Sequence, residues 1–154
     1  EVGADRIAGA IGAIQRRPAS NLIVVDCGTA TTFDVVTGEG DYLGGAILPG
    51  VGISVETLAG RTAKLPTVEL IRPTVALGRS TIESIQSGVY HGHAGAIRHL
   101  VTELSREAFG GQRPYVVGTG GFARLLEAEK LFDEIVPELV LLGLKYAEAA
   151  NRDA

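Results

Sequence analysis

The run "NLIVVD", residues 21–26, is the sequence feature that most restricts how this chain folds. Its apolar residues are mostly β-branched and follow one another without a polar break, which is typical of a strand buried on both faces. Asp26 ends the run, and a carboxylate beside a buried strand is costly unless it has a partner. The run therefore predicts a central strand of an α/β sheet, with a ligand near its carboxyl end.

The rest of the chain predicts the other elements of an α/β fold with a mixed sheet. Apolar residues at spacings of three and four predict helices over residues 3–17, 52–60, 80–109, 122–130 and 137–150. Short β-branched runs predict further strands over residues 31–37, 42–49, 114–118 and 134–136. We expect Ser80 to cap the longest helix, close to a capping box with Glu83, and Pro137 to lie in the first turn of the last helix. Residues 64–78 are expected to form an extended loop.

The composition describes a globular protein and argues against two kinds of partner. The chain has 154 residues, of which 45% are apolar and 21% charged, so it can bury a core and is not disordered. Its net charge is −4 and its cations are dispersed, which argues against nucleic-acid binding. We expect no membrane association, because no apolar run is long enough to cross a bilayer. A single cysteine, Cys27, fits a reducing compartment, so we expect a cytoplasmic protein.

The stretch "DCGTATT", residues 26–32, has the residues of a loop that binds an anion and a cation. Gly28 lets the backbone approach a phosphate, while Thr29 and the threonines after it offer hydroxyl and N–H donors. A carboxylate beside a phosphate is favourable where a cation lies between them, so Asp26 is a candidate cation ligand. A tight β-turn followed by strand-forming threonines explains the same residues, and spacing alone leaves both interpretations open.

Two further stretches carry candidate functional residues. "VGTGG", residues 117–121, is an apolar strand that runs into glycines before a helix, as in many nucleotide-binding turns. It lacks the dinucleotide and P-loop spacings, so a plain strand-to-helix turn is an open alternative. "GADR", residues 3–6, opens the first helix. Asp5 is either a residue that stabilises the helix N-terminus or a general base, with Arg6 beside it for an anionic substrate.

Other polar residues are weaker candidates. His91 and His93 are two positions apart and do not share a helix face, which argues against a metal pair. Cys27 is expected to be a small buried residue rather than a nucleophile. The pair Glu127 and Glu129 is expected on a solvated helix face.

Six segments resemble, in the same order, motifs of the type III pantothenate kinases, a family also known as the Baf type. They are "EVGADRIAGAI", "NLIVVDCGTATTFDVV", "YLGGAILPGVGIS", "TAKLP", "GRSTIESIQSGVYHG" and "VGTGGFA". The resemblance implies a ribonuclease-H-like lobe of the actin-like ATPase (ASKHA) superfamily, with a mixed sheet and flanking helices. It also implies ATP-dependent phosphorylation of pantothenate to 4′-phosphopantothenate, the first step of coenzyme A biosynthesis.

The resemblance further implies roles for single residues. Asp5 would be the catalytic base that takes the proton of the pantothenate hydroxyl, and Asp26 would hold a monovalent cation, K⁺ or NH₄⁺. Mg²⁺ would accompany ATP. The contacts implied are to pantothenate from Gly3, Ala4, Asp5, Arg6 and Thr81, and to ATP from Gly28, Thr29, Gly118, Gly120 and Gly121. The chain departs from the family at Cys27, where an aromatic residue is common. It also has Ser80 before Thr81 where the family usually has an Asn-Thr pair.

Two expectations concern the whole molecule. Members of the family open with a strand carrying an Asp-x-Gly-Asn-Thr phosphate loop, which nothing in residues 1–154 resembles. We therefore expect residues 1–154 to be a single C-terminal lobe that is incomplete as an enzyme. Family members are homodimers, and the glycines at 88, 92 and 95 of the longest helix could supply close helix contacts. The alternative function is a non-catalytic ligand-binding or regulatory Baf-type module on the same fold.

Overall fold

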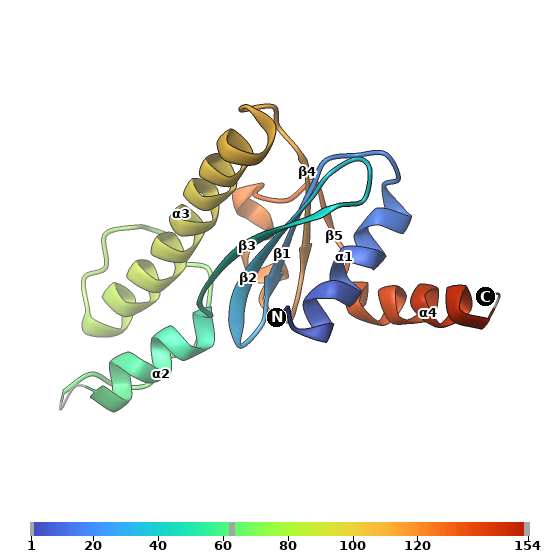
Figure 1. Ribbon diagram of the computed structural model, residues 1–154. Coiled ribbons are helices and arrows are strands. Elements are labelled where there is room, and N and C mark those ends of the chain that lie inside the picture. The colour runs from blue at the N-terminus through green and yellow to red at the C-terminus, as the bar shows by residue number, and fades with distance from the viewer. Residues whose placement is uncertain (1, 62–63, 153–154) are drawn as a thin grey trace.

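The apolar run that follows Asn21 forms the middle strand of a five-stranded sheet (Figure 1). The computed structural model describes residues 2–61 and 64–152, so the first two residues of "TAKLP" lie outside the described residues. The strands are β1 (Leu22–Cys27), β2 (Ala30–Val36), β3 (Tyr42–Pro49), β4 (Tyr115–Thr119) and β5 (Glu134–Ile135). They lie in the order β3-β2-β1-β4-β5. The first three form an antiparallel meander, whereas β4 and β5 run parallel to β1, which confirms the predicted mixed sheet of a ribonuclease-H-like lobe.

Helices cover both faces of this sheet. The helical elements are α1 (Ala4–Arg16), α2 (Val51–Arg61), α3 (Thr81–Phe109), the 3₁₀ helix η1 (Arg124–Glu129) and α4 (Leu139–Arg152). In Figure 1, α1 and α4 lie on one side of the sheet and α3 on the other, while α2 projects away from it. Within residues 2–61 and 64–152, none of the helices combines the length and the apolar character that a bilayer crossing requires.

The two faces explain why β1 has no polar break. Ile23 and Val25 pack in the cluster under α3 and η1, while Leu22 and Val24 pack in the cluster under α1 and α4. Alternate side chains of a strand point to opposite faces, so a strand covered on both sides must be apolar throughout.

Most predicted elements are confirmed, and three details differ. Ser80 accepts a hydrogen bond from the Glu83 backbone N–H, as a cap should, but the Glu83 carboxylate accepts from Arg79 N–H rather than from Ser80. The helix predicted over residues 122–130 is a short 3₁₀ helix that ends where Lys130 adopts a left-handed conformation, with φ of 52°. Pro137 precedes the last helix, which begins at Leu139.

The backbones of α1 and α4 touch through two glycines. A Cβ on Gly12 would come within 2.5 Å of the Leu139 carbonyl oxygen, and a Cβ on Gly143 would overlap the Ala8 carbonyl. Small residues at a crossing let two helices approach closely. This crossing holds α1 over the sheet and so fixes the direction in which its first turn points.

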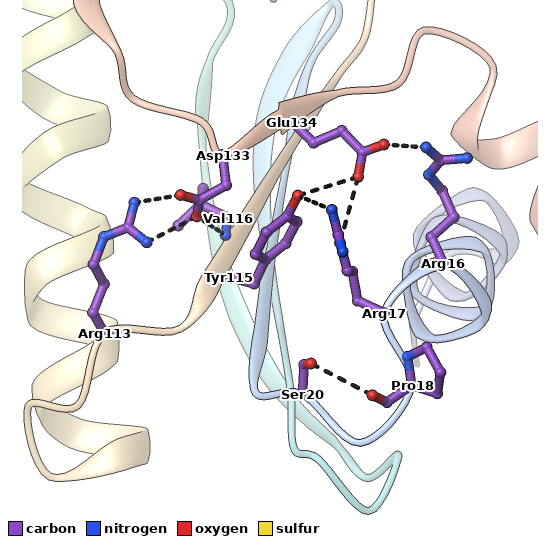
Figure 2. A network of polar contacts seen from close by, with 9 residues as sticks. All are labelled: Arg16, Arg17, Pro18, Ser20, Arg113, Tyr115, Val116, Asp133 and Glu134. Carbon is purple, nitrogen blue, oxygen red and sulfur yellow. Dashed lines mark hydrogen bonds and ion pairs between the residues drawn. The ribbon is translucent and has the colours of Figure 1, made fainter.

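A polar network closes the end of the sheet where β1 and β4 begin (Figure 2). Its charged and aromatic members are Arg16, Arg17, Arg113, Tyr115, Asp133 and Glu134. Arg113 forms a two-pronged pair with Asp133 at 2.8 and 3.0 Å, and Arg16 pairs with Glu134. Arg17 donates to the Tyr115 hydroxyl at 2.6 Å and lies over its ring. The network ties α1, β4 and β5 together at the end of the sheet opposite Asp26.

Candidate functional site

The two glycine-containing loops predicted from the sequence meet at the carboxyl ends of β1 and β4. These strands are parallel neighbours, and Asp26 pairs in register with Thr119. The Phe122 N–H donates to the Cys27 carbonyl at 3.0 Å and joins the loops directly. The structure therefore brings "DCGTATT" and "GTGG" together at the edge of the sheet where open α/β sheets bind ligands.

The backbone of two glycines lies close to the Asp26 carboxylate. Gly120 has φ of +86°, and a Cβ there would overlap Asp26 Oδ1 and the Cys27 backbone. A Cβ on Gly28 would lie 3.4 Å from the same oxygen. Gly120 must therefore be glycine for both its conformation and its close approach to the Asp26 loop.

The other predicted loop residues occupy different surroundings. Thr29 and Gly121 are exposed at the surface of the site, where a ligand can reach them. Gly118 is buried, and a Cβ there would lie 2.6 Å from the Phe132 ring, so its lack of a side chain serves packing within the sheet. Gly50 was missed by the sequence reading. Its N–H donates to the Thr29 carbonyl at 3.0 Å, which ties the loop at residues 26–30 to the residue after β3.

Asp5 lies near Asp26, at the start of α1. It is exposed, and its Oδ1 folds back so closely that a Cβ on Gly3 would lie 2.7 Å away. Ala4, next to it, is exposed as well. The pKa of Asp26 is raised, first because burial disfavours its charged form and then because of the negative charges of Asp5 and Asp34. Two predicted carboxylates thus share one site.

This surrounding is suited to a cation. A half-buried carboxylate with a raised pKa and negative neighbours is stabilised in its charged form when a cation lies beside it. Carboxylate and carbonyl oxygens are the ligands that hard cations prefer, and the loop at 26–30 offers both. In the part of the chain that the structure describes, no three His, Cys, Asp or Glu side chains gather as a metal-binding group. The residues therefore fit a cation that is bound partly by protein oxygens and partly by a bound anion. They fit less well a metal site built from protein ligands alone.

Arg6 is held inside the protein. Its Nε donates to Asp34 Oδ1 at 2.8 Å, and its Nη2 lies 2.7 Å from the same oxygen and donates to the Phe33 carbonyl at 3.2 Å. The Tyr42 hydroxyl donates to this oxygen as well, at 2.6 Å. The sequence reading missed Asp34, although an acidic residue inside the apolar run "TTFDVV" was a usable signal.

Thr81 lies in a separate place. It lines a cavity of about 1110 Å³ between the end of β3, α2 and the first half of α3, together with Leu48, Ser54, Thr57, Gly88 and His93. Neither Asp5 nor Asp26 lines this cavity. Gly88 and Gly92 both face it, and a Cβ on either, or on Gly95, would meet open space.

The structure also shows the surroundings of the weaker candidates, which are one cysteine, two histidines and two glutamates. Cys27 is buried, as predicted, and burial, followed by the charge of Asp26, raises its pKa to about 12, so the thiol keeps its proton. His93 is buried with its Nε2 2.9 Å from Thr31 Oγ1, whereas His91 is exposed. Glu127 is solvated as predicted, but Glu129 is half-buried and accepts from the Tyr90 hydroxyl at 3.1 Å.

Comparison with known proteins identifies the family. The family described as "Type III pantothenate kinase" matches residues 1–103. The chain belongs to this family. A type III pantothenate kinase of Legionella pneumophila (strain Corby) is 52% identical over 151 residues, which cover 98% of this chain and 59% of that protein. Type III pantothenate kinase 1 of Francisella tularensis subsp. holarctica (strain OSU18) is 43% identical over 152 residues.

A solved structure shares the fold. A conserved Campylobacter jejuni protein assigned to the Baf family of transcriptional activators superposes with a TM-score of 0.70 at 22% identity, over 99% of this chain and 66% of that one. At this identity the likeness concerns the fold alone. The chain spans about three-fifths of the length of the type III pantothenate kinases that it matches.

Proposed function

We propose that this chain is the C-terminal lobe of an enzyme that transfers the γ-phosphoryl group of ATP to pantothenate. The observation that carries the proposal is the meeting of Asp5, Asp26 and two glycine loops at one edge of the sheet, in a member of the type III pantothenate kinase family. Phosphoryl transfer asks little covalent chemistry of a protein beyond positioning, charge neutralisation and one base. The site offers residues for each of these tasks.

Asp5 is the base in this proposal. Its carboxylate is exposed at the start of α1, so a substrate hydroxyl can reach it. As that oxygen forms its bond to the γ-phosphorus, the bond from phosphorus to the β-phosphate oxygen breaks, ADP leaves, and Asp5 takes the hydroxyl proton. Gly3, Ala4 and the part of Arg6 not bound to Asp34 would line the same end of the pantothenate site. Thr81 lines a separate cavity, so it would contact another part of pantothenate from α3.

The loops at 26–30 and 118–121 would hold ATP and its cations. Asp26 would bind K⁺ or NH₄⁺, whose chemistry is to neutralise charge between the carboxylate and the phosphates, while Mg²⁺ would arrive with ATP. Thr29 and Gly28 would face the phosphates, with Gly120 and Gly121 on the nucleotide side. Gly118 would contribute through the shape of its strand, because it is buried against Phe132.

The rest of the assembly is part of the same proposal. The type III pantothenate kinases are longer than this chain, and we propose that an N-terminal lobe with a phosphate loop completes the site. We further propose a cytoplasmic homodimer.

The test is pantothenate-dependent ADP formation with K⁺ and Mg²⁺ present. The chain would be assayed alone and fused behind the N-terminal part of the Legionella relative. We expect activity only in the fusion, and a loss of about 10²- to 10⁴-fold in kcat on Asp5→Asn, because the base is removed. Asp41→Asn, an exposed carboxylate in the β2–β3 turn, is the matched control and should change nothing.

No activity in a folded fusion would overturn the proposal. It would favour the non-catalytic ligand-binding module instead. Full activity of Asp5→Asn would leave the reaction in place but remove Asp5 as its base.

A further inference from the structure

The first turn of α1 is exposed to solvent except at Arg6. Gly3 caps the helix without a side-chain hydrogen bond. Ala4, Asp5 and Ile7 are exposed, whereas the buried residues of α1 lie between Ala8 and Ala13. A helix end without capping or packing frays readily. Whatever holds Arg6 therefore determines how firmly Asp5 is held.

The sheet is shaped to receive the Arg6 side chain. Gly45 of β3 pairs with Asp34 of β2, and a Cβ on Gly45 would overlap the Phe33 carbonyl that Arg6 binds and would lie 3.2 Å from Arg6 Nη2. Tyr42, from the same strand as Gly45, donates to the Asp34 oxygen that Arg6 also binds. Burial, followed by the hydrogen bond to Asp34, raises the pKa of Tyr42 to about 12, so this hydroxyl keeps its proton and remains a donor.

The pair itself is largely withdrawn from water. The Asp34 side chain is 3% exposed and that of Arg6 17%. A charged pair in this position is strongly coupled, because loss of either partner leaves the other buried without compensation. A guanidinium that bonds a carboxylate and a carbonyl at once is held in one place, and this restrains the turn from which its side chain projects.

We propose that Asp34 is a positioning residue: by holding Arg6, it fixes the first turn of α1 so that the Asp5 carboxylate stays beside Asp26. Asp34 acts through Arg6 and not on the reacting atoms. The catalytic part of this inference rests on the proposed function, in which Asp5 is the base. It also follows that the charge of Arg6 is compensated within the protein rather than offered whole to an anionic substrate.

The first test measures the helix turn without any assay of activity. The Ile7 N–H bonds the Gly3 carbonyl in the first turn, and the Arg17 N–H bonds the Ala13 carbonyl at the other end. In this chain, Asp34→Asn should speed solvent exchange of the Ile7 amide, measured by NMR, by about tenfold and leave Arg17 unchanged. Unchanged exchange at Ile7 would overturn the proposal.

A matched control removes the other tether of α1. Glu134→Gln breaks the pair with Arg16 at the C-terminal end of the helix. It should speed exchange at Arg17 but not at Ile7. Equal loosening of both ends by either substitution would mean that Asp34 only supports general stability, and the proposal would fall.

The second test uses the fusion that phosphorylates pantothenate. Asp34→Asn should lower kcat by about 10- to 100-fold with the KM for ATP within about twofold, because a small displacement of a base costs rate rather than nucleotide binding. Glu134→Gln should leave kcat unchanged. Faster exchange at Ile7 with an unchanged kcat would overturn the positioning role.

A second variant covers the case in which Asp34→Asn does not fold. Arg6→Lys keeps the charge but loses the fork that reaches both Asp34 and Phe33. It should give an intermediate increase in Ile7 exchange and an intermediate loss of kcat, and wild-type values for both would overturn the proposal. Where the unsubstituted fusion itself shows no phosphorylation, the proposed function fails, and exchange at Ile7 still decides whether Asp34 holds the turn.

Discussion

His93 shows how burial selects one protonation state at a single residue. It projects from α3, is 6% exposed, and lies 2.9 Å from the Thr31 hydroxyl, just after the loop that begins at Asp26. Burial lowers the pKa of His93, so the folded protein holds the neutral imidazole. His93 therefore supports the segment at residues 26–32, through Thr31, from the side of the sheet covered by α3.

This contact predicts a pH dependence of stability. Because the pKa of His93 is lower in the folded protein than its ordinary 6.5, the unfolded chain binds a proton first as the pH falls. The contribution is complete above pH 6.5 and is lost as the pH falls toward the folded pKa. Urea unfolding between pH 7.5 and 5 should show this loss, and His93→Gln should remove it and cost about 1–3 kcal/mol at pH 7.5.

His91 is the matched control, because it is the exposed neighbour two positions away on the same helix. His91→Gln should keep the pH dependence of the unsubstituted chain. A pH profile that is the same in His93→Gln and His91→Gln would contradict the assignment.

The sequence predicted which residues belong to the candidate site, but not which other side chains they contact. Asp26, Gly28 and the glycines near residue 120 stood out because polar residues and glycines interrupt apolar runs there. The role of Asp34 did not emerge, since its partner Arg6 is 28 positions away and only the β2–α1 packing brings them together. The placement of Thr81 in a separate cavity depends likewise on the path of the chain between α2 and α3.

At the scale of elements, the contact between α1 and α4 depends on two missing side chains. Gly143→Ala would place a methyl group against the Ala8 carbonyl and force the helices apart. We expect a loss of about 1–3 kcal/mol in the free energy of unfolding, measured with urea. The first turn of α1 should move with the helix, so activity of the fusion should fall too.

Gly95 of α3 provides the opposite case. A Cβ there would meet open space, so Gly95→Ala should stabilise the helix by about 0.5–1 kcal/mol. If Gly143→Ala were also stabilising, helix propensity and not close packing would decide both positions.

The elements themselves could be predicted because each carries its own local pattern. A helix that packs on a core repeats its apolar residues every three to four positions, as the long helix after Ser80 does, whereas a strand covered on both faces, such as β1 before Asp26, is an unbroken apolar run. What could not be predicted is how two elements meet. Nothing within α1 or α4 alone distinguishes Gly12 and Gly143, which touch a neighbour, from Gly95, which does not.

At the scale of the molecule, β3 forms an open edge of the sheet among the described residues. It carries Leu43 and Ile47, which are 53% and 63% exposed. An edge strand with exposed apolar side chains pairs readily with other chains. Ile47→Lys should therefore reduce concentration-dependent association of this chain, measured by sedimentation velocity, with a change in stability within about 0.5 kcal/mol.

Leu141 of α4 tests whether the strand edge matters or only apolar exposure. It is 62% exposed but lies on a helix. Leu141→Lys should reduce association less than Ile47→Lys. An equal reduction would show that association does not depend on the edge of the sheet.

The joining of α1 to later parts of the chain has a consequence for synthesis on the ribosome. Arg16 and its partner Glu134 are 118 positions apart, and α4, on which α1 packs, is made later still. At 5–20 residues per second, on the order of ten seconds pass between the two. During that interval the apolar stripe of α1 has no helix to cover it, so the nascent chain is open to chaperones or to a neighbouring nascent chain until α4 emerges.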